Sequence, residues 1–211
     1  MFCLFAQLFS QIAQAVQGRL IAGTAAIDTP VATSTFTDSR QVVEGSVFVA
    51  IAGERVDGHD YVSKVGAQGA VAAIVDHEID GAGVPQIVVE DTVLALGALA
   101  KHNIERRRAL ETPFTVIGIT GSVGKTTTKD LMKALLAHIG PTIAPVGSFN
   151  NEIGLPLTSL KVHAETRFLV AEMGANHVGE IANLTSLVPP DIAVVLKVGV
   201  AHLGEFGSPE R

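Results

Sequence analysis

The sequence predicts an α/β protein of two domains, the second of them built on a parallel sheet with a phosphate-binding loop. Short apolar runs alternate with helical segments in the second half of the chain, as they do where helices connect the strands of a parallel sheet. Residues 118–128 form a glycine-rich loop between such a run and a helical segment. Pro113 would break a helix continuing between the halves, which indicates a linker over 110–113. We therefore expect domains at 1–110 and 111–211.

The first domain is expected to hold helices and short strands separated by glycine and proline turns. Its first helix, over about 6–17, would turn Leu8, Ile12 and Val16 inward. The other elements expected in this half are strands over 47–51, 70–75 and 86–89, a helix over 61–68, and a helix over 92–108 with Leu94, Leu96, Leu99 and Ile104 as its apolar side.

The second domain is expected to alternate strand and helix. Expected strands cover 114–119, 168–171 and 192–196, and expected helices cover 125–138, 151–160 and 178–187. This order predicts a parallel sheet that is covered on both faces.

Composition excludes several classes of function. The formal net charge of −6 argues against non-specific nucleic-acid binding, which needs a basic face. No apolar run approaches the roughly 20 residues of a membrane helix, and the first residues lack the basic segment of a signal peptide, so we expect no membrane insertion. The single cysteine, Cys3, suits a reducing cytoplasm, because it cannot form an intramolecular disulfide.

The loop Gly118-Ile-Thr-Gly-Ser-Val-Gly-Lys125-Thr126 has the composition of a phosphate cradle. Its backbone N–H groups and the following helix N-terminus would bind phosphate oxygens, while glycines allow close approach. Lys125 would reach the β and γ phosphates, and the Thr126 hydroxyl would ligate Mg²⁺. The usual spacing places a glycine where this chain has Ile119, and Gly118 stands one residue earlier.

Two further residues follow apolar runs, where parallel strands place ligand-binding groups. Glu172 closes the run 168–171 and precedes Gly174, so its carboxylate is expected at the carboxyl edge of the sheet. His202 follows the later run, although a lone histidine there is more often structural.

Two polar segments have a structural interpretation on their residues alone. Asn150 and Asn151 precede a helix and would cap it. Asp38, Ser39 and Arg40 would form a turn with an exposed charge pair.

Several blocks resemble the Mur ligases, in the order in which that family has them. The phosphate loop is followed by Ser148-Phe-Asn-Asn-Glu-Ile-Gly-Leu-Pro-Leu-Thr158, by Glu172-Met-Gly-Ala-Asn-His-Val-Gly-Glu-Ile181 and by Gly199-Val-Ala-His-Leu-Gly-Glu-Phe-Gly-Ser208. In the first half, Thr37-Asp-Ser-Arg40 and the block 48–59 are similar to the UDP-binding domain of the family. The later blocks look like the member that adds D-alanyl-D-alanine.

The resemblance implies a fold, a reaction and a set of site residues. The fold is a small N-terminal α/β UDP-binding domain followed by a partial P-loop-type ATP-binding domain. ATP would activate the terminal carboxylate of UDP-N-acetylmuramoyl-tripeptide as an acyl phosphate, which the amine of D-alanyl-D-alanine then attacks. Lys125, Glu172 and His202 would be catalytic. The implied ATP-binding residues are Thr120, Gly121, Ser122, Val123, Gly124, Lys125, Thr126 and Thr127; the Mg²⁺ ligands are Thr126, Glu172 and His202; the residues for the UDP precursor are Asp38, Ser39, Arg40, Asn150 and Asn151.

The chain departs from the family pattern in two ways. Lys197 stands where the family usually has asparagine, near the implied metal site. The chain ends at Arg211, before the rest of the central domain and the C-terminal domain of the family. We therefore expect this polypeptide to be a fragment that is inactive on its own.

Three other functions remain open on the sequence. The relative that adds the third amino acid shares the UDP-domain motifs, although the loop and the Asn150-Asn151 block favour the member that adds D-alanyl-D-alanine. A non-catalytic module that binds a nucleotide or the UDP precursor is a second alternative. A simple P-loop kinase is a third, but it would leave the first half without a role.

Overall fold

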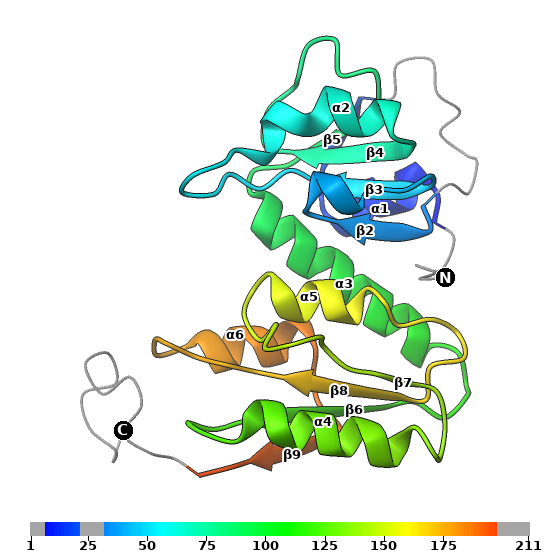
Figure 1. Ribbon diagram of the computed structural model, residues 1–211. Helices are drawn as coiled ribbons and strands as arrows, with labels where there is room; N and C mark the ends of the chain where they lie inside the picture. Colours follow the sequence, from blue (N-terminus) through cyan, green and yellow to red (C-terminus); the bar gives the residue numbers. More distant parts are fainter. Residues whose placement is uncertain (1–6, 22–31, 198–211) are drawn as a thin grey trace. The chain divides into compact units, whose positions relative to one another are not determined.

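The computed structural model describes residues 7–21 and 32–197. The chain forms two compact units, Met1–Asn103 and Ile104–Arg211, so the division falls before the segment expected as a linker. Both units are mixed α/β structures, which confirms the predicted fold class (Figure 1). Among the described residues, no helix is long and apolar enough to cross a bilayer.

The N-terminal unit contains a five-stranded sheet in the order β1-β5-β4-β3-β2. Strands β2 to β5 pair in parallel, and β1 pairs antiparallel with β5 at one edge. The elements are α1 (Phe9–Ala15), β1 (Arg19–Ile21), β2 (Ser34–Phe36), the 3₁₀ turn η1 (Ser39–Gln41), β3 (Ser46–Val49), the 3₁₀ turn η2 (Gly58–Tyr61), α2 (Val62–Ala67), β4 (Ala70–Val75), β5 (Gln86–Val88) and the start of α3 (Thr92–Arg108).

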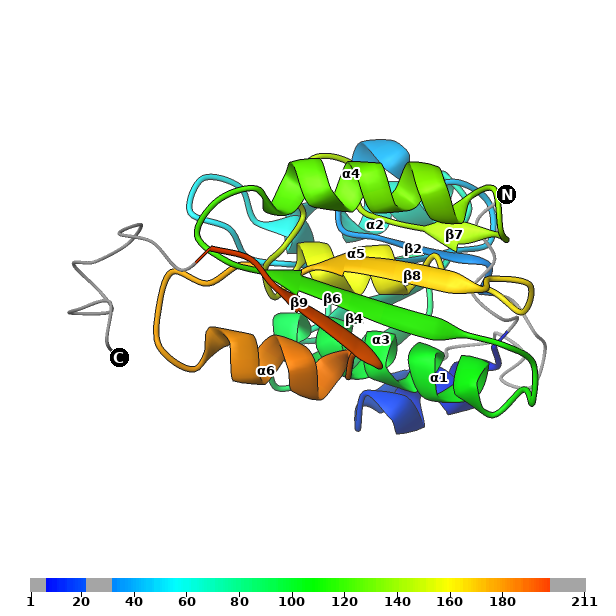
Figure 2. The ribbon, with the colours of Figure 1, turned by 90° about the horizontal axis from the view of Figure 1, so that it is seen from below.

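Helices cover both faces of this sheet. Val62 and Val65 of α2 pack against Phe48, Ala73 and neighbouring residues on one face. Helix α1 and the first part of α3 lie on the other face, as both ribbon views show (Figures 1 and 2). Strands β3 and β4, in the middle of the sheet, are apolar apart from Ser46 because they are buried on both sides.

The second unit contains a four-stranded, entirely parallel sheet in the order β7-β8-β6-β9. Its elements are β6 (Thr115–Thr120), α4 (Lys125–Leu136), β7 (Thr142–Ile143), α5 (Gly154–Ser159), β8 (Phe168–Glu172), α6 (Glu180–Leu187) and β9 (Ile192–Val195). Alternate residues of β6 and β8 divide between two apolar clusters. Val116 and Leu169 face α5 and α6, whereas Ile117 and Val170 face α4. The expected parallel sheet with two covered faces is therefore confirmed.

Helix α3 has the bounds that were expected, but its buried face differs. Asp91 Oδ1 accepts hydrogen bonds from the backbone N–H groups of Val93 and Leu94, and this cap starts the helix. Leu96, Leu99 and Ile104 are buried as predicted, whereas Leu94 is 69% exposed. The assignment of Leu94 was wrong because residues two apart lie on nearly opposite sides of a helix.

The end of α3 is held by a buried arginine. The Arg107 guanidinium is almost fully buried and donates hydrogen bonds to the backbone carbonyls of Thr166 and Pro113. These bonds hold the segment that precedes β6 in place, and the phosphate loop follows directly after β6.

Candidate nucleotide and substrate site

The phosphate loop turns from the carboxyl end of β6 into the first turn of α4. Gly121 and Gly124 have φ angles of +138° and +87°, which L-residues with side chains rarely adopt. A Cβ at Gly121 would also lie 2.8 Å from Leu196 Cβ. As the N-cap of α4, Gly124 offers no side chain to the amides of the first helical turn, so these amides are available to an anion.

Lys125 crosses this loop. Its Nζ donates a hydrogen bond to the carbonyl of Gly121 at 2.6 Å, and its side chain lines the pockets on both sides. A backbone hydrogen bond connects the loop to the segment after β9: the Ser122 N–H donates to the carbonyl of Lys197 at 3.0 Å. Lys197 itself is exposed, and its described contribution to the loop is this backbone contact.

Glu172 lies at the carboxyl end of β8, opposite Ile119 of β6, as the sequence predicted. It is 1% exposed. Its Oε1 accepts hydrogen bonds from Thr126 Oγ1 at 3.3 Å and from Asn150 Nδ2 at 3.0 Å. The structure thus brings three of the expected site residues into one cluster.

The second oxygen of Glu172 is buried without a partner. Within residues 7–21 and 32–197, Glu172 Oε2 has no hydrogen-bond partner, although burial of an unpaired carboxylate oxygen is costly. A divalent cation beside the Thr126 hydroxyl would satisfy it, because hard cations prefer carboxylate and hydroxyl oxygens. The residues present therefore fit Mg²⁺.

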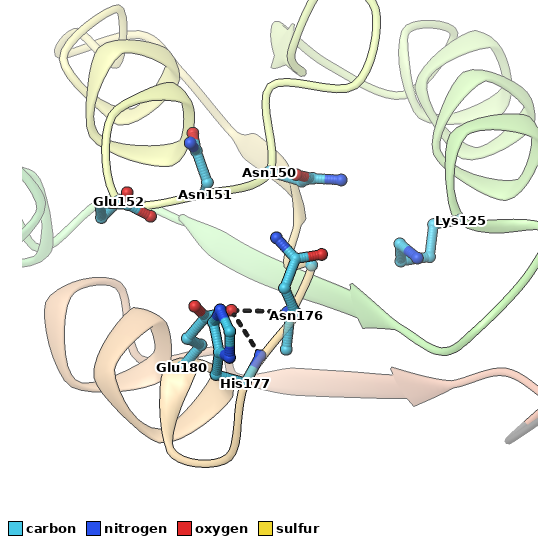
Figure 3. A pocket seen from close by; sticks show the side chains of 9 residues that line it. Lys125, Asn150, Asn151, Glu152, Asn176, His177 and Glu180 are labelled. Carbon is cyan, nitrogen blue, oxygen red and sulfur yellow. Dashed lines mark hydrogen bonds between the residues drawn. The ribbon is translucent and has the colours of Figure 1, made fainter. Parts of the chain in front are cut away.

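Two adjoining pockets meet at Lys125 and Asn150. The first is lined by the phosphate loop, Thr126, Thr127 and Glu172. The second lies beyond Asn150, and its lining includes Asn151, Asn176, His177 and Glu180 (Figure 3). In this pocket Glu180 Oε2 accepts hydrogen bonds from the backbone N–H groups of Asn176 and His177, which shapes the turn after β8.

Asn150 approaches the strand end closely because residue 174 is a glycine. The Gly174 N–H donates to the Asn150 carbonyl at 2.8 Å, and a Cβ at Gly174 would lie 2.7 Å from Asn150 Cγ. The neighbouring Asn151 has a different contact, since its Oδ1 accepts from the Gly154 N–H at the start of α5. The Asn151 side chain therefore bonds to the first residue of α5, whereas the Asn150 amide contacts Glu172.

Asp38, Ser39 and Arg40 lie in the N-terminal unit, directly after β2. Arg40 donates to both Asp38 oxygens, through Nε at 2.9 Å and Nη2 at 2.7 Å. This pairing with Arg40 holds the pKa of the Asp38 carboxyl well below its usual range. The Arg40 side chain is 85% exposed, so the pair forms a surface turn that presents a guanidinium to solvent.

Comparison with known proteins identifies the family. The model of the Mur ligase middle domain matches residues 119–211, and the model described as Mur ligase family, catalytic domain, matches residues 33–104. The chain belongs to the Mur ligase family.

The relatives of this Mur ligase chain include UDP-N-acetylmuramoyl-tripeptide–D-alanyl-D-alanine ligases. The UDP-N-acetylmuramoyl-tripeptide–D-alanyl-D-alanine ligase of Mycobacterium tuberculosis is 45% identical over 192 residues, which are 82% of this chain and 37% of the relative. The ligase of the same name from Escherichia coli K12 is 39% identical, over 94% of this chain and 42% of the relative. The chain therefore spans about two fifths of the length of these relatives.

Solved structures give the same result. A MurF crystal structure from Acinetobacter baumannii matches 98% of this chain and 44% of its own, with a TM-score of 0.86 and 40% identity. The MurF ligase of Thermotoga maritima, solved in complex with ADP, matches 84% of this chain and 40% of its own, with a TM-score of 0.73 and 39% identity. The resemblance seen in the sequence of this Mur ligase chain is thus confirmed.

Some residues of the Mur ligase site escaped the sequence analysis. Asn176, His177 and Glu180 were given no role in the sequence analysis, although all three line the second pocket. The signal that could have found them is their position after β8, on the same sheet edge as Glu172. His202 lies outside the described residues.

Proposed function

We propose that this chain forms the nucleotide- and UDP-precursor-binding part of an ATP-dependent ligase that adds D-alanyl-D-alanine to UDP-N-acetylmuramoyl-tripeptide. The observation that carries the proposal is the pair of pockets that meet at Lys125 and Asn150. A ligase must hold the terminal phosphate of ATP next to a substrate carboxylate, and adjoining pockets that share a cation suit that task. The names of the relatives supply the identity of the substrates.

The reaction requires positioning and neutralisation of charge more than a protein nucleophile. A carboxylate oxygen of the tripeptide attacks the γ-phosphorus and ADP leaves, which gives an acyl phosphate. The amine of D-alanyl-D-alanine then attacks the acyl carbon, phosphate leaves with the bonding electron pair, and the amine loses a proton. Lys125 and the amides at the start of α4 would stabilise the phosphate charge during the first step.

Mg²⁺ fits the cluster at Glu172. The Thr126 hydroxyl and Glu172 would hold it, together with His202, and Thr120 to Thr127 would bind the nucleotide around it. When bound, the ion would neutralise charge on the terminal phosphates. Asn150 would keep Glu172 oriented through its hydrogen bond to Oε1.

The precursor is assigned to two places. Asp38, Ser39 and Arg40 would contact the UDP portion, where Arg40 offers an exposed guanidinium of the kind that binds phosphate. Asn150 and Asn151 would contact the part of the precursor next to the reacting carboxylate. We assign small molecules as the partners, with no nucleic acid and no membrane insertion, and we place the reaction in the cytoplasm.

The test is calorimetric titration of the 211-residue chain with Mg²⁺ and a non-hydrolysable ATP analogue. We expect binding that Lys125→Ala weakens at least tenfold. Lys133→Ala removes an exposed cation from the same helix and should leave the affinity unchanged. Equal affinities for wild type and Lys125→Ala would refute the assignment of the loop.

A second titration distinguishes the two ligases. We expect UDP-N-acetylmuramoyl-tripeptide to bind, and Arg40→Ala to weaken that binding. Preference for the corresponding dipeptide precursor would instead indicate the relative that adds the third amino acid. Failure of both precursors to bind would refute the UDP assignment.

A further inference from the structure

We propose that His59, Asp76 and His77 form a binding site for a divalent transition metal, with zinc as the best match. The three residues offer two ring nitrogens and a carboxylate oxygen that all lie within 4.8 Å of one another. They lie in the N-terminal unit, whereas the cluster at Glu172 lies in the other unit. The proposal is independent of the ligase reaction.

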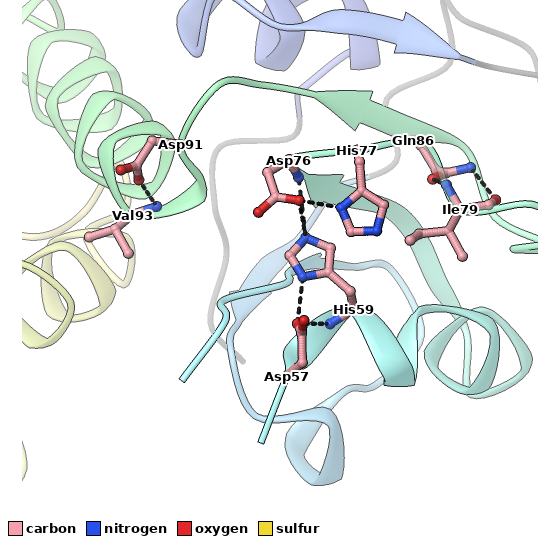
Figure 4. A network of polar contacts seen from close by, with 8 residues as sticks. All are labelled: Asp57, His59, Asp76, His77, Ile79, Gln86, Asp91 and Val93. Atoms are coloured by element: carbon pink, nitrogen blue, oxygen red, sulfur yellow. Dashed lines mark hydrogen bonds and ion pairs between the residues drawn. The ribbon is translucent and has the colours of Figure 1, made fainter. Parts of the chain in front are cut away.

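His59 is oriented as a metal-binding histidine is. It is 5% exposed and lies in η2, where Asp57 Oδ1 accepts a hydrogen bond from its Nδ1–H at 2.6 Å (Figure 4). Asp57 Oδ1 also accepts from the His59 backbone N–H, and these two bonds hold the pKa of the Asp57 carboxyl below its usual value. A carboxylate on one ring nitrogen is the usual partner of a metal-bound imidazole, because it fixes the tautomer and directs the other lone pair at the metal.

The lone pair of His59 Nε2 points toward Asp76. The Asp76 N–H donates to Nε2 at 3.2 Å, and Asp76 Oδ1 lies 3.2 Å from the same nitrogen. Zinc–nitrogen and zinc–oxygen bonds of about 2.0–2.1 Å in a tetrahedron separate neighbouring ligand atoms by about 3.3 Å, close to this spacing. The metal would replace the hydrogen bond from the Asp76 amide to Nε2.

His77 supplies the third ligand. Its ring stacks on that of His59, with centroids 4.8 Å apart and an angle of 26° between the planes. Its Nδ1 contacts Asp76 Oδ1, so both rings converge on one carboxylate.

The ligand set determines the class of metal. Two imidazoles with one carboxylate suit zinc, copper or nickel, whereas Mg²⁺ prefers oxygen ligands alone. The His77 side chain is 61% exposed, which leaves a coordination position of the metal open to water or to a ligand. A bound metal would fasten η2 to the carboxyl end of β4.

The experiment is calorimetric titration of the 211-residue chain with Zn²⁺, repeated with Co²⁺ and visible absorption spectroscopy. We expect one ion per chain at this site, a Co²⁺ spectrum of low coordination number, and a rise in Tm when Zn²⁺ is added. His77→Ala should lower the Zn²⁺ affinity at least tenfold and remove the rise in Tm. Since the His77 side chain is mostly exposed, its loss leaves the fold intact.

Two further variants distinguish metal binding from a purely structural network. Asp57→Asn removes no metal ligand, yet it should lower the affinity about 10- to 100-fold, because the tautomer of His59 is no longer fixed. His138→Ala removes an exposed histidine from the other unit and should change nothing. Zn²⁺ affinity that is the same in wild type and His77→Ala, or that falls only in His138→Ala, would overturn the proposal.

Discussion

Replacing Lys129 by methionine should destabilise the second unit and loosen the pocket that contains Asn150. The Lys129 side chain is 1% exposed, and its Nζ donates to the carbonyls of Pro145 and Gly147, both at 3.0 Å. A third contact, at 2.8 Å, joins Nζ to Asp130 Oδ1. The lysine thus fastens α4 to the segment that leads to Asn150.

The magnitude follows from the groups that the change leaves behind. Methionine keeps most of the apolar stem, so packing is nearly preserved. Pro145 is buried and its carbonyl would lose a partner, which costs about 1–3 kcal/mol, whereas the exposed Gly147 carbonyl can be rehydrated. Removing a buried ammonium offsets part of the lost hydrogen bonding. We therefore expect the free energy of unfolding to fall by about 2 kcal/mol.

Urea denaturation followed by far-ultraviolet circular dichroism measures this change. Lys133→Met, an exposed lysine on the same helix, is the matched control and should stay within about 0.5 kcal/mol of wild type. Hydrogen exchange should be faster in residues 145–150 of Lys129→Met and unchanged in the N-terminal unit. If both variants unfold at the same urea concentration, the buried ammonium does not hold this loop.

Three other changes test the site. Glu172→Gln should raise the free energy of unfolding, measured in urea, by about 1 kcal/mol, because it removes a buried charge with one unpaired oxygen. The same change should abolish the Mg²⁺ dependence of nucleotide binding. A less stable variant that keeps this dependence would contradict the metal assignment. Gly174→Ala should displace the Asn150 side chain and weaken precursor binding measured by calorimetry, with a stability loss of about 1 kcal/mol; unchanged affinity would show that the close approach is not needed. Arg40→Ala should raise the pKa of Asp38 toward its usual value, as followed by carboxyl NMR. Because Arg40 lowers the pKa of Asp38 in the folded state, the stabilisation of the fold by this pair is complete above the unfolded-state pKa of about 3.9. This stabilisation is lost as the pH falls toward the lower pKa of the folded state. An unchanged Asp38 titration in Arg40→Ala would refute the pairing.

The sequence was most informative where local rules determine structure. The strand, loop and helix around Lys125 were predicted closely, because the apolar run indicates a strand, the glycines a loop and the segment that follows a helix. The same holds for β4, whose apolar run ends where the strand ends. The position of Glu172 followed from the rule that parallel strands bring their carboxyl ends to one edge.

Long-range contacts were not predictable in this way. The hydrogen bond from Asn150 to Glu172 joins residues 22 positions apart, and the packing of the turn after β8 decides it. Strand β7 has two residues, too few for a periodic signal. The stacking of His59 on His77 depends on where η2 meets the end of β4, which neither segment encodes alone.

The hydrogen bond between Lys125 and Gly121 also bears on the entropy of phosphate binding. A lysine side chain that is free in solution loses roughly 2 kcal/mol of rotational freedom when it is immobilised. Here the fold has already restricted that side chain, because one ammonium proton is committed to the loop carbonyl. The other two protons remain for oxygen ligands. A phosphate therefore meets a cation that is largely in place, and more of the electrostatic attraction appears as affinity.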